Sequence, residues 1–229
     1  MTIQLVLLPG MDGTGELFGP LLARLPLEMR ASVIGYPDRP ASYAEHVSFA
    51  QRELPRNEPF ILLGESFSGP VAVSIAAGAP PALRGIVLCA SFLTCPHPAL
   101  KLLRPFTPVA SPKLLPGFVA QRTLLGRFAT PELRAAQTRA LSHVSSPTLT
   151  ARLRAMADVD VRNEMSLAQV PTLYLQATED RLVRDRFADE YVKHARVARV
   201  ERIEGPHLLL QANPQDCAKA ICAFITACR

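Results

Sequence analysis

The sequence lacks the features that would place it in a membrane or send it across one. No apolar run among its 229 residues approaches the roughly 18 residues that a membrane-spanning helix needs. The first residues, up to Leu8, contain no basic stretch and lead directly into a glycine-rich turn. We therefore expect them to form a strand and not a signal peptide, and we expect no membrane span.

Cysteine is scarce, and its spacing excludes the common metal-binding motifs. The five cysteines are odd in number and do not follow the spacing of zinc ligands. Three of them lie near the C-terminus without a histidine close by (Cys217, Cys222 and Cys228). We expect all five to be reduced packing residues, which is typical of a cytoplasmic protein. Internal repeats and low-complexity segments are absent as well.

The formal charge of +5 would suit a nucleic-acid-binding protein, but its distribution argues against one. Residues 92–166 contain ten basic and four acidic side chains, a net charge of +6. The remainder of the chain has fifteen basic and sixteen acidic side chains, a net charge of −1. Aromatic and basic residues are not interleaved in the way that stacks nucleic-acid bases. The excess charge belongs to one segment, and we expect no nucleic-acid partner.

Short apolar segments alternate with helical patterns along most of the chain. Six of these segments are predicted strands, at residues 3–8, 32–36, 60–63, 85–90, 172–176 and 197–203. The alternation indicates an α/β fold, with a mostly parallel sheet of about six strands and helices on both faces. Residues 92–168 differ, because they are rich in proline and contain short amphipathic helices, two of them with N-caps predicted at Thr130 and Ser146. We expect a core of residues 1–91 and 169–229, with a helical cap at 92–168 inserted after the fourth strand.

A glycine- and serine-rich turn, Gly64-Glu-Ser-Phe-Ser-Gly69, joins the third predicted strand to a helix of small residues. Strand, tight turn and helix form the setting in which the serine of G-x-S-x-G, here Ser66, projects its hydroxyl beyond the sheet. The residues two positions away must be small, because strand and helix nearly touch there. Gly64 meets this need, and Ser68 stands where the motif usually has glycine. Ordinary turns have similar compositions, so the turn alone does not identify Ser66 as a nucleophile. The rest of the chain must supply the evidence.

A serine nucleophile needs a base, and one histidine is placed to supply it. His207 follows the last predicted strand, whereas the other four lie inside predicted helices or the cap (His46, His97, His143 and His194). Glu179 and Asp180 follow the strand at 172–176, where a carboxylate can orient the base. The carboxyl ends of parallel strands lie at one edge of the sheet. We therefore expect Ser66, His207 and one of these acids to meet there.

Four motifs together resemble the α/β-hydrolase superfamily from end to end: Leu8-Pro-Gly-Met-Asp-Gly-Thr-Gly15, Gly64-Glu-Ser-Phe-Ser-Gly69, Ala177-Thr-Glu-Asp-Arg-Leu-Val183 and Gly205-Pro-His207. The resemblance implies Ser66 as nucleophile, Asp180 as orienting acid and His207 as base. It also implies the backbone N–H groups of Met11 and Phe67 as the donors of an oxyanion hole. No metal or organic cofactor is implied.

The chain departs from the superfamily pattern in two further places. Pro9 stands where many relatives have histidine, which affects the orientation of the first glycine loop. The first predicted strand corresponds to the third strand of the superfamily. We therefore expect the antiparallel edge of the sheet to be missing.

The basic charge of the cap suggests an acidic protein partner. The size of the chain and its cap are similar to the carrier-protein methyl esterases of biotin synthesis, in which cap arginines dock an acidic acyl carrier protein. The charge of the cap marks four candidate partner-binding residues, Arg134 and Arg139 on one predicted helix and Arg152 and Arg154 on the next. A merely solvated face is the alternative interpretation of the same charges. The first glycine loop also resembles plastid esterase/acyltransferases that act on phytol and diacylglycerol.

The leading hypothesis from the sequence is a serine esterase that cleaves a small acyl ester through an acyl-enzyme. The substrate would be free or linked to a carrier protein as a methyl ester. The same three residues would serve an acyl thioesterase or a lipase-like acyltransferase, and the sequence does not separate these activities. A hydrolase fold that only binds a ligand is the alternative from another class, and the complete set of triad residues argues against it.

Overall fold

The computed structural model describes residues 3–103 and 117–228 of the chain. Six strands form one sheet in the order β2-β1-β3-β4-β5-β6, and every neighbouring pair is parallel. The bounds are Gln4–Leu8 (β1), Ala31–Val33 (β2), Phe60–Glu65 (β3), Leu83–Cys89 (β4), Thr172–Ala177 (β5) and Ala198–Ile203 (β6). The predicted α/β fold is confirmed, and within the described ranges the sheet has no antiparallel edge.

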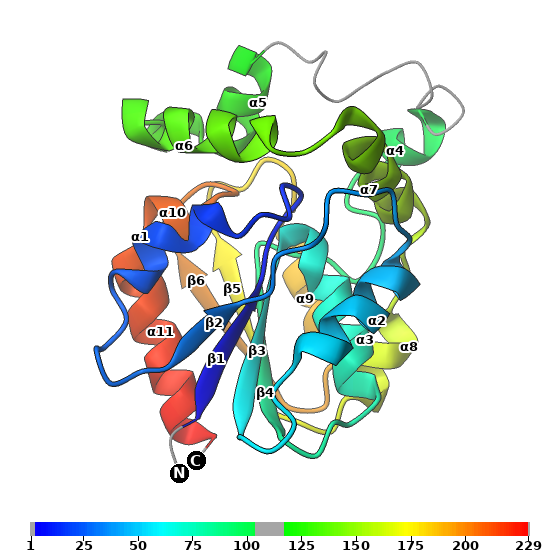
Figure 1. Ribbon diagram of the computed structural model, residues 1–229, viewed down its shortest axis with the longest axis vertical. Coiled ribbons are helices and arrows are strands. Elements are labelled where there is room, and N and C mark those ends of the chain that lie inside the picture. Colours follow the sequence, from blue (N-terminus) through cyan, green and yellow to red (C-terminus); the bar gives the residue numbers. More distant parts are fainter. Residues whose placement is uncertain (1–2, 104–116, 229) are drawn as a thin grey trace.

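Helices cover both faces of the sheet (Figure 1). One face is covered by α1 (Gly19–Leu22), α10 (Leu209–Ala212) and α11 (Pro214–Ala227). The other face is covered by α2 (Tyr43–Glu53), α3 (Gly69–Ala77), α8 (Arg162–Leu167) and α9 (Arg186–His194). Short 3-10 helices occur at η1 (Glu16–Phe18), η2 (Ser66–Ser68) and η5 (Gly126–Phe128). No helix among the described residues combines the length and the hydrophobicity needed to cross a bilayer.

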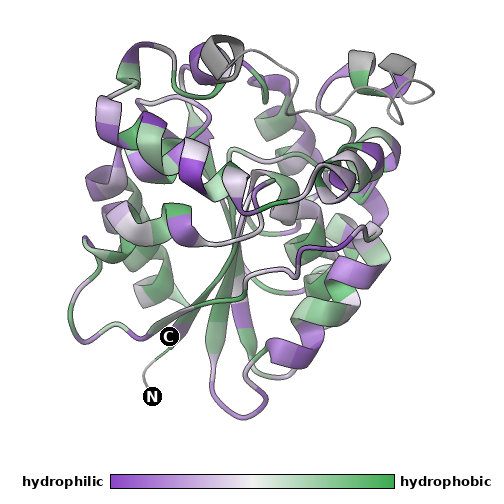
Figure 2. Ribbon diagram, turned by 45° about the horizontal axis from the view of Figure 1, so that its top comes forward, coloured by the Kyte–Doolittle hydropathy of each residue, from purple (hydrophilic) through white to green (hydrophobic). Residues whose placement is uncertain are grey.

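The sheet separates two hydrophobic cores, because its central strands are buried on both sides. Along β3, Phe60 and Leu62 pack into the core beneath α2 and α3, while Ile61 and Leu63 pack into the core beneath α11. Figure 2 shows the central strands as largely hydrophobic and the surrounding helices as a mixture of hydrophobic and hydrophilic residues. Each fully buried aliphatic or aromatic side chain contributes about 1.5–3 kcal/mol. These cores fix the carboxyl ends of the strands, from which the candidate site is built.

The expected cap consists of helices where it is described. They are α4 (Pro98–Leu103), α5 (Gly117–Leu124), α6 (Pro131–Ser142) and α7 (Ser146–Asp158), and they lie above the carboxyl ends of the strands (Figure 1). Residues 104–116 of the expected cap, with Arg104 and Lys113, lie outside the described residues. Met165 of α8 is fully buried in the core that also contains α3. We therefore propose that the cap comprises α4 to α7 and that α8 belongs to the core.

The cap helices α6 and α7 each begin with a side-chain cap and an early proline. At α6, the Thr130 hydroxyl accepts a hydrogen bond from the Leu133 N–H at 3.2 Å, as predicted. At α7, the N-cap is Ser145 and not the predicted Ser146. The reason is a contact from outside the helix, since the Ser145 N–H and hydroxyl both donate to the Asp38 carboxylate. This contact ties the start of α7 to the loop after β2.

Candidate active site

Three side chains form a continuous hydrogen-bonded series at the carboxyl edge of the sheet. Ser66 Oγ lies 2.8 Å from His207 Nε2, and His207 Nδ1 lies 2.7 Å from Asp180 Oδ2. Ser66 directly follows β3, while Asp180 and His207 lie in the loops after β5 and β6. With Nδ1–H donating to the carboxylate, Nε2 is left free to accept the serine proton. The structure therefore brings together the nucleophile, base and acid expected from the sequence.

The turn that carries Ser66 is strained and tightly packed. Ser66 has a φ of 48°, in the left-handed region, where a non-glycine residue costs about 1–3 kcal/mol. A Cβ at Gly64 would lie 2.5 Å from the Ser68 carbonyl oxygen, and one at Gly69 would lie 1.7 Å from Ser91 Oγ. The Ser91 hydroxyl in turn donates to the Ser66 carbonyl oxygen at 2.7 Å. Both glycines are therefore required by close packing, against the Ser68 backbone at Gly64 and against the Ser91 side chain at Gly69. Such crowding is typical of a nucleophile elbow.

Two opposing influences act on the protonation of His207. Burial alone would lower its pKa, because an imidazolium is poorly solvated inside the protein. The charge and hydrogen bond of Asp180, together with the more distant Glu65 carboxyl, raise it more strongly. The pKa of His207 is therefore raised above its ordinary value of 6.5. Its partner is equally sheltered, since the Asp180 side chain is only 2% exposed and its Oδ1 accepts the N–H groups of Leu182 and Val183.

The neighbouring acid, Glu179, contacts Arg127 and not His207. Its carboxylate receives two close hydrogen bonds from Arg127 of η5, at 2.6 and 2.9 Å, and Arg127 also pairs with Glu204. This pairing lowers the pKa of the Glu179 carboxyl. Of the two acids that follow β5, only Asp180 contacts His207 in the described part of the chain.

The first glycine loop is joined to the turn at Ser66 through Pro9 and Ser68, both of which depart from the superfamily pattern. The Ser68 hydroxyl donates to the carbonyl oxygen of Pro9, and Tyr36 lies 2.8 Å from the same hydroxyl. Met11, at the centre of this loop, lines the same cavity as Ser66, and Phe67 is the residue after the nucleophile. The serine that replaces glycine thus supplies a hydrogen bond that a glycine could not.

Arg152, on α7, supports the same loop and is not part of a docking surface. Its side chain is only 1% exposed, and its guanidinium donates to the carbonyl oxygens of Met11 and Asp12, both at 2.9 Å. Gly13 has a φ of 70°, and a Cβ there would lie 2.5 Å from the guanidinium. The prediction that Arg152 binds a partner is wrong, because the loop covers it. The sequence held a sign of this, since Arg152 falls on the apolar face of α7 together with Leu149 and Met156.

A second buried acid lies beside the nucleophile. Glu65 ends β3 with 2% of its surface exposed. Its carboxyl accepts hydrogen bonds from the Gln211 amide, at 2.9 Å, and from the Gly10 backbone N–H. Burial raises the pKa of this carboxyl to about 7, despite the stabilising hydrogen bonds. Glu65 was not predicted from the sequence. It connects the end of β3 to the first glycine loop.

Ser66 and His207 open onto a cavity of about 60 Å³ between the core and the cap. Its apolar walls are formed by Met11, Leu17, Leu124, Leu141 and Leu208. Its polar lining comprises Asp12, Glu65 and Gln137. In residues 3–103 and 117–228, no cluster of three or more His, Cys, Asp or Glu side chains is arranged to bind a metal ion.

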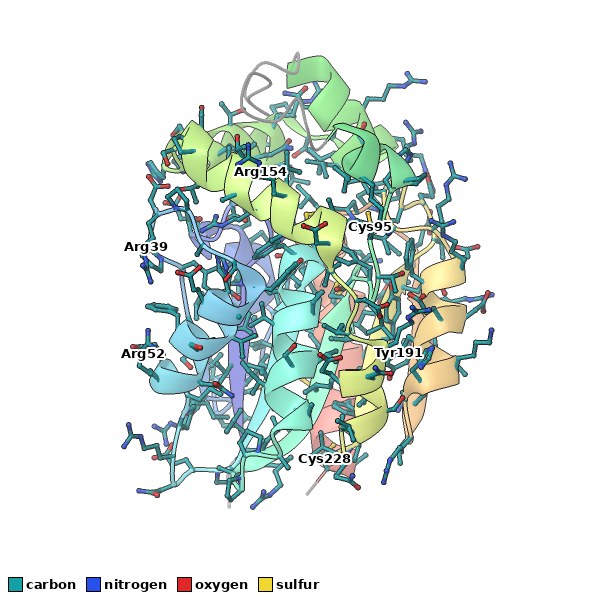
Figure 3. The ribbon with its side chains drawn as sticks, turned by 90° about the vertical axis from the view of Figure 1, so that its right-hand side faces the viewer. Arg39, Arg52, Cys95, Arg154, Tyr191 and Cys228 are labelled. Carbon is teal, nitrogen blue, oxygen red and sulfur yellow. The ribbon has the colours of Figure 1, made fainter. Side chains whose placement is uncertain are left out.

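The three remaining candidate arginines lie on the outer surface of the cap. Arg134 and Arg139 are exposed residues of α6, and Arg139 forms a loose pair with Glu16 at 3.6 Å. Arg154 is an exposed residue of α7, among the helices at the top of the molecule (Figure 3).

Solved structures share the fold along nearly the whole chain. The enol-lactonase from Burkholderia xenovorans LB400 has a TM-score of 0.86 at 16% identity, covering 99% of this chain and 92% of that chain. The esterase from Exiguobacterium antarcticum has a TM-score of 0.81 at 18% identity, covering 98% and 92%. MenH from S. aureus has a TM-score of 0.82 at 16% identity, covering 100% and 95%. At these identities, the likeness establishes the fold alone.

Sequence comparison supplies the family. None of the curated proteins compared with the chain matches it. The family model described as serine aminopeptidase, S33, matches residues 37–209. This range is well over half of the chain and contains Ser66, Asp180 and His207. The chain therefore belongs to the serine aminopeptidase S33 family, a hydrolase family, and has the α/β-hydrolase fold.

Proposed function

We propose that the protein is a serine hydrolase that cleaves carboxylic esters through an acyl-enzyme on Ser66. The observation that carries this proposal is the hydrogen-bonded series from Ser66 through His207 to Asp180, at 2.8 and 2.7 Å. The positive φ of the serine and the cavity in front of it support the same conclusion. A serine packed for structural reasons alone has no need of a strained backbone and a buried base.

In the first half of the reaction, the Ser66 oxygen attacks the ester carbonyl carbon while its proton passes to His207 Nε2. The resulting tetrahedral intermediate collapses, the bond to the alkoxy group breaks, and the alcohol leaves with the proton from His207. In the second half, water gives a proton to His207 and its oxygen attacks the acyl-enzyme. The acid is released, and the proton returns to Ser66. Asp180 holds the imidazole in the required tautomer throughout and stabilises its positive charge.

The negative charge that develops on the carbonyl oxygen needs donors aimed at it. We assign this role to the backbone N–H groups of Met11, which lines the cavity with Ser66, and of Phe67, the residue after the serine. Each donor of this kind stabilises the transition state by roughly 3–4 kcal/mol. The contacts of Ser68 and Arg152 with the first glycine loop support the assignment, because they hold the Met11 backbone in place.

The proposal is tested by hydrolysis of p-nitrophenyl acetate as a function of pH. The value of kcat/KM should rise with pH about a midpoint above 6.5, because only neutral His207 accepts the serine proton and its pKa is raised. The Glu65→Gln variant should keep this dependence with its midpoint at lower pH. The reason is that the Glu65 charge is one of the influences that raise the pKa of His207.

Parallel substrates separate ester hydrolysis from the other activities open to the same residues. A p-nitrophenyl ester should be cleaved faster than alanine p-nitroanilide, and faster than the matching thioester. Faster release from the anilide would favour a peptidase, and faster release from the thioester would favour a thioesterase. Transfer of the acyl group to added alcohol in preference to water would indicate an acyltransferase. The absence of any turnover, with no labelling of Ser66 by a fluorophosphonate, would indicate a binding protein.

An ester linked to an acidic carrier protein is the second candidate substrate. The observation that favours it is the position of Arg134, Arg139 and Arg154, which are exposed on adjoining cap helices. Single exposed ion pairs contribute at most about 1 kcal/mol, so such a surface would act mainly by accelerating encounter. The methyl ester of a carrier-linked acyl group is the substrate to examine.

Reversing these three charges together, with Arg134→Glu, Arg139→Glu and Arg154→Glu, should raise KM for the carrier-linked methyl ester by roughly tenfold or more at low salt. The effect should disappear at high salt, and KM for p-nitrophenyl acetate should not change. Steady-state kinetics at two ionic strengths provide the measurement.

The matched control reverses three exposed arginines of the core, Arg24, Arg52 and Arg56, and changes the net charge by the same amount. It should leave both substrates unaffected. An equal response of the cap and core variants would mean that the cap is only a charged, solvated face.

A further inference from the structure

Gln137 occupies a position that the pattern of its helix reserves for an apolar side chain. It lies on the buried face of α6 with Ala140 and is four residues before Leu141. Its side chain is 5% exposed, and it lines the cavity in front of Ser66 and His207. A leucine or methionine would fill this position without a polar atom. The presence of an amide here needs a reason.

The amide nitrogen of Gln137 has no hydrogen-bond partner among the described residues, although it is buried. Burying an N–H donor without an acceptor is unfavourable, and buried polar groups in native proteins are nearly always paired. An unpaired donor at the wall of a reaction cavity is expected where the substrate brings the acceptor. The donor then discriminates strongly against a substrate that lacks it.

The surroundings of the amide restrict what that acceptor can be. The apolar side chains of Leu124 and Leu141 line the same cavity, so a large polar group would be desolvated there without compensation. Apart from Ser66 and His207, the other polar side chains of the cavity wall are the carboxyls of Asp12 and Glu65. A substrate carboxylate would be repelled by them, whereas a neutral oxygen would not.

The volume restricts the length of the acyl group. The cavity measures about 60 Å³. A water-sized atom needs roughly 10–15 Å³, so there is room for about four to six of them. An acyl group of two to four carbons with one additional oxygen fits this space.

We propose that Gln137 determines substrate specificity by donating a hydrogen bond to a neutral ether, keto or hydroxyl oxygen of a short acyl group bound to Ser66. The inference rests on the ester-hydrolase function proposed above and names the class of acyl group that this site takes. The residue contacts the substrate but takes no part in proton transfer.

The test compares p-nitrophenyl methoxyacetate with p-nitrophenyl butyrate, whose acyl groups have the same length and differ by an ether oxygen in place of a methylene. The quantity measured is the ratio of their kcat/KM values, in the wild type and in Gln137→Met. Methionine keeps the length of the side chain and removes the donor. The ratio should fall roughly five- to tenfold in Gln137→Met, because one hydrogen bond to the substrate is lost. Comparing ratios cancels the greater intrinsic reactivity of the methoxyacetate.

The control is Leu141→Met, which alters the wall of the same cavity without adding or removing a donor. Its ratio should match the wild type. Thermal unfolding gives an independent readout: Gln137→Met should have an unchanged or higher Tm, since an unpaired buried amide is replaced by an apolar group.

The outcomes separate this inference from the function on which it rests. An unchanged ratio in Gln137→Met, with both esters still hydrolysed by the wild type, would overturn the inference alone. A lower Tm with an equal loss of activity on both esters would also overturn it, because the amide would then be structural. A wild type that hydrolyses neither ester would overturn the proposed function and this inference with it.

Discussion

Replacing Ser66 with alanine should abolish ester hydrolysis while leaving the protein folded. Removal of a triad nucleophile lowers kcat on the order of 10⁶-fold, because no other group can form the acyl-enzyme. The fold should survive, because among the residues that the structure describes the Ser66 hydroxyl forms a hydrogen bond only with His207. The strained backbone of the turn is held by other groups, namely Gly64, Gly69 and the hydrogen bond from Ser91. The measurement is kcat for p-nitrophenyl acetate, with circular dichroism and Tm as checks on folding.

The matched control for this experiment is Ser68→Ala, two residues further along the same turn. It removes a hydroxyl that bonds to the Pro9 carbonyl oxygen but leaves the nucleophile in place. This variant should lose far less activity than Ser66→Ala. The loss it does show should come from a less firmly held first glycine loop. If Ser66→Ala retained more than a few per cent of wild-type activity, after contaminating esterases were excluded, the nucleophile would have been assigned wrongly.

The second large effect is expected at Asp180. The Asp180→Asn variant should lose about 10⁴-fold in kcat, because an amide no longer fixes the His207 tautomer that leaves Nε2 free for the serine. The geometry of the site should persist, since asparagine has the same shape. Loss of the carboxylate charge should also lower the pKa of His207, because Asp180 is the group that raises it most. The pH dependence of the residual activity measures this shift.

The Glu179→Gln variant tests which of the two acids after β5, Glu179 or Asp180, orients His207. Its carboxylate pairs with Arg127 on the surface, so the variant should keep nearly normal kcat/KM. The opposite ranking, with Glu179→Gln inactive and Asp180→Asn nearly normal, would show that the orienting acid is one residue earlier.

The sequence alone was sufficient for the fold because the local and global signals agree. Six short apolar segments separated by amphipathic helices leave a parallel sheet as the arrangement that buries both faces of each strand. The ends of helices were less well determined. Ser146 was predicted to cap α7, but Ser145 caps it, because Asp38 from a distant loop holds that residue.

The candidate triad was also accessible from the sequence, for a topological reason. Parallel strands place their carboxyl ends at one edge, so residues that follow β3, β5 and β6 meet there whatever their separation along the chain. Motif spacing then distinguished Asp180 from Glu179. The structure adds the contacts that explain the choice, at 2.7 Å to His207 for one acid and 2.6 Å to Arg127 for the other.

The sequence by itself determined the sheet, the elbow and the residues that follow the strands, since each depends on the order of residues along the chain. Only the tertiary structure decided the burial and the contacts of Arg152, Glu65 and Gln137. Arg152 is one of the candidate partner-binding charges of the sequence, yet it is buried against the first glycine loop and donates hydrogen bonds to its carbonyl oxygens. Charge and helical periodicity do not reveal what a side chain contacts, because those contacts join segments far apart in sequence. The partners of a buried polar group are fixed only when the core and the cap close around it.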